Sequence, residues 1–180
     1  CNTLTAAKDV DGISLASLAA VFTDAPDGFP PCTAAACVAI LEHYKVPIAG
    51  KHVVVIGRSL VVGKPVSMML LRRNASVTIC HSRTENLQEI SRSADIVICA
   101  TGRARAYGRE YFRPGQTVLD VGINFDVHGK LCGDVDFDEV EPIVDAITPV
   151  PGGVGTVTTS MTMQHTVAAA EAQLKESLKG

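Results

Sequence analysis

The stretch that most limits the possible folds is HVVVIGRSLVVGKPVSMMLL, at residues 52–71. A run of β-branched residues ends at Gly57, and a glycine-marked turn then leads into a segment with helical periodicity. This order is typical of the start of a nucleotide-binding domain, because the amides at a helix N-terminus can hold a pyrophosphate. The usual G-x-G-x-x-G pattern is altered, since Ser59 replaces the middle glycine and Gly63 comes one position late. Taken alone, the turn is weak evidence for a dinucleotide.

Short apolar runs alternate with helical segments through the middle of the chain. The predicted strands, rich in Val and Ile, are 52–57, 76–80, 95–100, 117–122 and 144–149. The predicted helices are 33–44, 63–73 and 85–92, with a short helical turn at 107–112. Such alternation indicates a parallel sheet with helices on both faces. The sequence therefore predicts an α/β fold of the Rossmann-like kind.

The bulk composition excludes several classes of protein. With 180 residues the chain can form one good core, and its net charge of −3 gives no electrostatic reason to bind nucleic acid or an anionic membrane. No apolar run approaches the roughly 20 residues that cross a bilayer. The six cysteines and five histidines are scattered, so we expect no metal site, and free thiols suit a reducing compartment. With no transit peptide visible, the cytoplasm is the default expectation.

The end of the second predicted strand bears on the choice of cofactor. In NAD-binding domains an acidic residue about 20 residues after the turn holds the ribose 2′-hydroxyl. Here that place reads CHSRT, at 80–84, and contains no acid. Ser82 and Arg83, with Arg58 in the turn, suit a 2′-phosphate instead, which indicates NADP rather than NAD. The alternative is that both arginines are solvated surface side chains, although their joint placement favours the phosphate.

Several sequence blocks recur in the order of one known family. They are KDVDG (8–12), PCT (31–33), GRSLVVGKP (57–65), CHSRT (80–84), ATG (100–102), DVGIN (120–124), GDV (133–135) and ITPVPGGVG (147–155). On these blocks the chain resembles the bifunctional methylenetetrahydrofolate dehydrogenase/methenyltetrahydrofolate cyclohydrolase family. GRSxxVGxP and PVPGGVG are highly specific, and the blocks cover nearly the whole chain.

The resemblance implies a cofactor site at the strand ends. The GRS turn would line the NADP site, Ser82 would meet the adenosine phosphate, and Ile123 would lie along the cofactor. Residues 101–102 follow a predicted strand end, as loops that contact a cofactor do. The expected cofactor-binding residues are Gly57, Arg58, Ser59, Gly63, Ser82, Arg83, Thr101, Gly102 and Ile123.

The resemblance also implies a folate site. The PGGVG loop would border the folate, and Asp11 matches the acidic folate-site residue of KDVDG. Without the resemblance, Asp9 and Asp11 read as loop residues that form Asx turns; with it, only Asp11 receives a folate role. The expected substrate-binding residues are Asp11, Pro151, Gly152, Gly153, Val154 and Gly155.

The chain departs from the family pattern in two places beside the folate and lacks one motif. Ala34 and Ala36 stand where the family has Pro and Gly, and residues 156–157 replace the usual Pro-Met. The family's catalytic Lys belongs to an upstream Tyr-x-x-x-Lys motif. No tyrosine of this chain has a Lys four positions later. We therefore expect no catalytic residue within it.

The domain organisation follows from the same resemblance. Residues 1–30 are expected to be a remnant of an N-terminal folate-binding catalytic domain, and residues 31–155 an NADP-binding domain. Residues 156–180 would form a helix, starting near a Thr N-cap, that packs back on the catalytic domain. The first residue is not Met, which indicates part of a longer protein.

The expected activity belongs to the longer protein. It would oxidise 5,10-methylenetetrahydrofolate with NADP and hydrolyse the product to 10-formyltetrahydrofolate, while the isolated chain would bind NADP with little or no turnover. A homodimer is implied by the family. Two alternatives stay open: an NADP-binding domain without catalysis of its own, and a different NADP oxidoreductase, such as a shikimate-type dehydrogenase, against which PVPGGVG argues.

Overall fold

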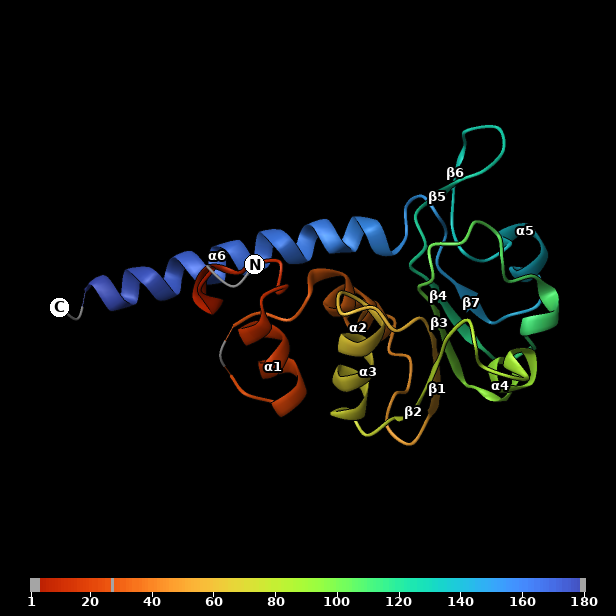
Figure 1. Ribbon diagram of the computed structural model, residues 1–180, viewed down its shortest axis with the longest axis horizontal. Coiled ribbons are helices and arrows are strands. Elements are labelled where there is room, and N and C mark those ends of the chain that lie inside the picture. Colours follow the sequence, from red (N-terminus) through yellow and green to blue (C-terminus); the bar gives the residue numbers. More distant parts are fainter. Residues whose placement is uncertain (1–3, 27, 179–180) are drawn as a thin grey trace.

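The computed structural model describes residues 4–26 and 28–178 and has a parallel sheet at its centre (Figure 1). The strand order is β2-β1-β3-β4-β7. The strands are β1 (His52–Ile56), β2 (Ser76–Cys80), β3 (Ile96–Cys99), β4 (Thr117–Asp120) and β7 (Ala146–Ile147). The register places Ile56 beside both Cys80 and Cys99, so the carboxyl ends of three strands are level. The loops that follow them therefore share one edge of the sheet.

Helices cover both faces of the sheet, which confirms the predicted fold class (Figure 1). One face carries α2 (Cys32–His43) and α3 (Gly63–Leu71), and the other carries α4 (Leu87–Ser93), the 3-10 helix η2 (Arg109–Tyr111) and α5 (Phe137–Val140). Alternation along β1 explains the two cores. Val53 and Val55 pack with α2 and α3, whereas Val54 and Ile56 pack on the opposite side.

The last helix, α6 (Val154–Ser177), runs along α2 and continues past the sheet for a total length of about 36 Å (Figure 1). Beside it lie η1 (Ala6–Lys8) and α1 (Leu15–Thr23). His165 of α6 stacks on Phe29 with a centroid distance of 4.8 Å, and its Nδ1 lies 2.9 Å from the carbonyl oxygen of Val10. Residues near the two ends of the chain therefore pack together, away from the sheet.

Several boundaries differ from the sequence prediction. Helix α6 starts at Val154 rather than near Thr156, because the Val154 side chain is buried in the core. Strand β4 ends at Asp120 rather than at residue 122, because the Asp120 carboxylate accepts the Gly122 N–H and turns the chain. Strand β7 pairs with β4 at only two positions.

A hairpin that the sequence did not predict follows β4. Its strands, β5 (Asn124–Phe125) and β6 (Leu131–Cys132), pair in antiparallel fashion and project away from the central sheet (Figure 1). Ile123, Phe125 and Val127 alternate along it and are 68%, 69% and 95% exposed. The hairpin thus presents an apolar edge to solvent. Within residues 4–26 and 28–178, no helix combines the length and apolar character needed to span a membrane.

Candidate cofactor site

The turn after β1 is built around two glycines and a serine hydroxyl. Gly57 has φ +137°, and a Cβ there would collide with the carbonyl oxygen of Ala100; a Cβ at Gly63 would collide with the Gly57 carbonyl. The Ser59 Oγ accepts hydrogen bonds from the amides of Val62 (3.0 Å) and Gly63 (3.4 Å). The serine that replaces the usual glycine therefore holds the turn that leads into α3.

A cavity of about 530 Å³ opens at this edge, between the loops that follow β1, β2 and β3. Residues predicted from sequence that line it are Gly57, Arg58, Ser59, Ser82 and Thr101. The other lining residues are His81, Thr84, Leu87, Ala100, Arg103, Ala106, Tyr107 and Tyr111. Arg58 and Arg103 bring two cations to one concave surface, which suits a phosphorylated ligand.

The loop after β2 is held by its own side chains. The His81 amide donates to Thr84 Oγ1 at 2.9 Å, and the Arg83 amide donates to His81 Nδ1 at 3.2 Å. His81 is therefore a loop-bracing residue. The side chains of Ser82 and Arg83 are exposed, and Ser82 alone of the two lines the cavity.

The loop after β3 is held by the side chain of Asp134. The amides of Thr101, Gly102 and Arg103 all donate to its carboxylate. Tyr107 donates its hydroxyl proton to Thr101 Oγ1 at 3.3 Å, and burial raises the pKa of this phenol. Sequence reasoning missed Arg103, Tyr107 and Asp134; for Arg103 the available signal was its position directly after ATG.

A second cavity, also of about 530 Å³, lies further along the same edge, at the ends of β4 and β7. It collects four of the predicted substrate-binding residues, Pro151, Gly152, Gly153 and Gly155. Ile123, predicted for the cofactor, lines this cavity instead of the first. Val154 is buried in the core beneath it. In the strand order of the sheet, the first cavity therefore lies over β2, β1 and β3, and the second lies over β4 and β7.

The two aspartates of KDVDG have different surroundings. Asp9 is buried and accepts hydrogen bonds from the amides of Ser14 (2.7 Å) and Ile13 (3.2 Å). Burial opposes ionisation of Asp9, but these bonds outweigh it and lower its pKa. Asp9 therefore forms the structural turn. Asp11 is exposed and lies near Cys32, and it lines neither cavity at the sheet edge.

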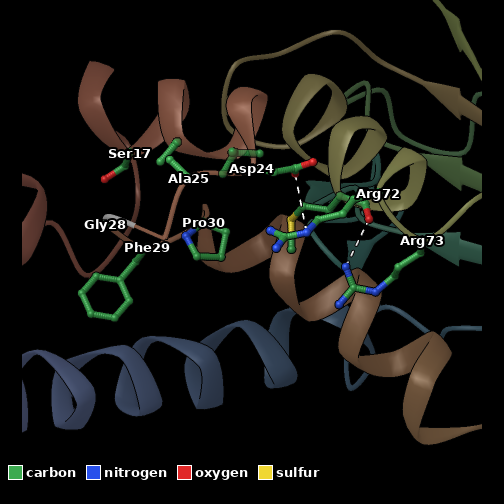
Figure 2. Close-up of a pocket in the computed structure, with 11 residues that line it drawn as sticks. Ser17, Asp24, Ala25, Gly28, Phe29, Pro30, Arg72 and Arg73 are labelled. Atoms are coloured by element: carbon green, nitrogen blue, oxygen red, sulfur yellow. Dashed lines mark hydrogen bonds and ion pairs between the residues drawn. The ribbon is translucent and has the colours of Figure 1, made fainter.

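A further hollow of about 500 Å³ lies between α1 and α3, away from the strand ends (Figure 2). Two arginines point into it, but each contacts a carboxylate: Arg72 meets Asp24 at 3.6 Å and Arg73 meets Glu42 at 2.6 Å. Because these charges are already compensated, the hollow offers little attraction to an anionic cofactor. The strand-end cavity is the better cofactor site.

The parallel sheet, the glycine turn capped by Ser59 and the cationic strand-end cavity define a dinucleotide-binding domain of the Rossmann type. Residues 31–174 match the family described as tetrahydrofolate dehydrogenase/cyclohydrolase, NAD(P)-binding domain. The chain belongs to this family.

Individual relatives agree with this assignment. The bifunctional protein FolD of Carboxydothermus hydrogenoformans is 60% identical over 166 residues, which cover 91% of this chain and 58% of that protein. The crystal structure of FolD from Campylobacter jejuni superposes with a TM-score of 0.89 at 40% identity, covering 92% of this chain and 59% of that one. The Trypanosoma brucei enzyme, solved with NADP cofactor and inhibitor, gives a TM-score of 0.86 at 36% identity over 93% of this chain and 60% of its own. The chain thus spans about three fifths of these relatives.

Proposed function

We propose that this chain is the NADP-binding part of an enzyme of one-carbon folate metabolism. The enzyme would oxidise 5,10-methylenetetrahydrofolate to 5,10-methenyltetrahydrofolate and hydrolyse that product to 10-formyltetrahydrofolate. One observation carries the proposal. Five residues selected from sequence, on loops after three different strands, line a single cavity in a member of the tetrahydrofolate dehydrogenase/cyclohydrolase family.

The residues of the cavity fit a phosphorylated dinucleotide. Gly57 lets the turn pack directly against the Ala100 backbone, and Arg58 and Arg103 supply positive charge. Ser82 and the adjacent Arg83 lie at the end of β2, where the adenosine ribose of a bound dinucleotide belongs. When bound, the nicotinamide accepts the hydride of the first reaction. The protein's part in that step is to bind and orient both reactants.

The second cavity supports a place for the folate. It lies at the same edge of the sheet as the cofactor cavity and is lined by the PGG turn, whose glycines permit close approach of a flat ligand. Cyclohydrolysis also needs proton transfer, which the resemblance assigns to the Lys of a Tyr-x-x-x-Lys motif absent from this sequence. We therefore assign this chain cofactor binding and part of the folate site, with turnover requiring the rest of the protein.

The ends of the chain support the proposed division into domains. The contacts of His165 with Val10 and Phe29 join the two terminal segments proposed to belong to the catalytic domain. Phe22, Met163, Val167 and Leu174 are each at least 58% exposed. A catalytic domain packed against α1 and the outer part of α6 would bury this apolar surface.

We extend the proposal to a homodimer and to a reducing compartment such as the cytoplasm. The apolar edge of the β5–β6 hairpin is a surface that a second copy could bury. Five cysteines of the described residues, Cys32, Cys37, Cys80, Cys99 and Cys132, are buried with free thiols. Unpaired thiols are usual where disulfides do not form.

The cofactor assignment is tested by calorimetric titration of the chain with NADP and, separately, with NAD. We expect NADP to bind about tenfold tighter, since charge-assisted hydrogen bonds to the 2′-phosphate are available only to NADP. Arg83→Ser should reduce this preference severalfold and leave NAD affinity unchanged. Arg72→Ser, which removes the same charge near the α1–α3 hollow, should alter neither affinity. Equal affinities for NAD and NADP in the unaltered chain would contradict the assignment to NADP.

A further inference from the structure

The carboxylate of Asp134 is completely buried and accepts five hydrogen bonds. Its Oδ2 accepts from the amide of Thr101 (2.5 Å), the Thr101 hydroxyl (2.9 Å) and the amide of Gly102 (3.1 Å). Its Oδ1 accepts from the amide of Arg103 and from Asn124 Nδ2, both at 2.9 Å. Every partner is a donor, so the arrangement uses the ionised carboxylate, which only accepts.

A second buried carboxylate holds Asp134 in place. Asp120, at the end of β4, accepts the amides of Asp134 and Val135 at 2.9 Å. Two glycines admit this packing: a Cβ at Gly122 would overlap the Asp134 carboxylate, and one at Gly133 would overlap the Asp120 carboxylate. Because Asp120 binds the backbone of Asp134 and Val135, and the two glycines allow close packing around both carboxylates, the Asp134 side chain has little freedom to move.

These bonds determine what the loop after β3 offers to a ligand. The three amides are directed to Asp134, so they are not available to a phosphate, unlike the amides of the usual glycine-rich loop. The loop instead presents the Thr101 and Arg103 side chains to the cofactor cavity. The conformation of this loop therefore determines the positions of the Thr101 hydroxyl and the Arg103 guanidinium in that cavity.

The strand order indicates which half of the cofactor this loop meets. The sheet runs β2, β1, β3, β4, and the cavity opens over the first three of these strands. With the adenosine 2′-phosphate at β2 and the pyrophosphate at the β1 turn, the nicotinamide half must extend over β3 towards the second cavity.

We propose that Asp134 is a positioning residue for the nicotinamide half of the cofactor, acting through the loop Thr101–Arg103. The proposal rests on the proposed NADP-binding function. It assigns a role in this site to the GDV block at residues 133–135.

The test compares two ligands on the full chain: NADP, and adenosine 2′,5′-bisphosphate, which carries only the adenosine half. In Asp134→Ala we expect the Kd for NADP to rise at least about tenfold while the Kd for the bisphosphate changes less than about twofold. Asp134→Asn should give a smaller rise, because the Asn124 amide can rotate to pair with it and mainly the Arg103 bond is lost. Asp136→Asn is the matched control, since it removes the same charge two residues away, at a surface ion pair with Arg105.

The titrations are made well below the unfolding temperature of each variant, which circular dichroism determines. If Asp134→Ala does not fold, Asp134→Asn carries the comparison. Equal weakening of both ligands would assign Asp134 a merely structural role and overturn the proposal, as would an unchanged Kd for NADP. If the unaltered chain binds NADP and Asp134→Ala binds it equally well, the positioning proposal fails alone. If it binds neither ligand, both proposals fail.

Discussion

Gly57→Ala should lower the free energy of unfolding by about 4 kcal/mol, the combined cost of backbone strain and overpacking. Gly57 has φ +137°, which side chains rarely adopt, and an added Cβ would collide with the Ala100 carbonyl oxygen at the end of β3. The turn and the neighbouring strand would have to separate, so NADP binding should be lost as well. Urea denaturation and calorimetric titration measure the two effects.

Gly129→Ala is the matched control for this experiment. Gly129 also has positive φ, at +74°, but a Cβ there meets no atom within 4 Å. In this variant the free energy of unfolding should fall by only about 1 kcal/mol, the cost of placing a side chain at positive φ. The variant should bind NADP as the unaltered chain does. A comparable loss of stability in both variants would show that the contact with Ala100 is unimportant.

Asp120 should make the chain less stable at pH 7 than at pH 4, by about 2 kcal/mol from this residue alone. Burial, reinforced by the neighbouring Asp134, raises the pKa of Asp120 from 3.8 to about 6, although three backbone amides pull it down. The folded protein therefore keeps the proton up to about pH 6, whereas the unfolded chain releases it near pH 3.8. Since the folded state binds more protons in this interval, stability falls as pH rises through it.

The measurement is the difference in stability between Asp120→Asn and the unaltered chain at each pH. The cost of placing an amide at this site is the same at every pH and cancels, so the variant should gain about 2 kcal/mol relative to the unaltered chain from pH 4 to pH 7. Asp126→Asn should show the opposite sign. Hydrogen bonds from the amides of Lys130 and His128 lower the pKa of Asp126, so its stabilisation is lost as pH falls. A pH-independent difference for Asp120→Asn would contradict the raised pKa.

The sheet was predictable because its determinants are local. Apolar runs such as residues 53–56 are bounded by turn residues, and buried parallel strands have this signature. The hairpin at 124–132 was missed because its strands have two residues each, which is too short for an alternating pattern to indicate a strand. The start of α6 was misplaced because burial of Val154, rather than a capping side chain, determines it.

The cofactor cavity was predictable in part for a similar reason. Gly57, Ser59 and Ser82 lie at strand ends, and the carboxyl ends of parallel strands meet at one edge. Asp134 lies 31 to 33 residues from the amides that it binds, and no periodicity links it to them. Its contribution depends on tertiary packing, which a single sequence does not display.

The packing of α6 along α2 also has a consequence for the order of events on the ribosome. About 110 residues separate the end of α2 from the start of α6, and at typical rates of synthesis their translation takes roughly 5 to 20 s. During that time α6 is not yet available to cover its side of α2. The nascent domain therefore passes through an interval in which chaperones, or other nascent chains, can reach an apolar helix that the finished fold conceals.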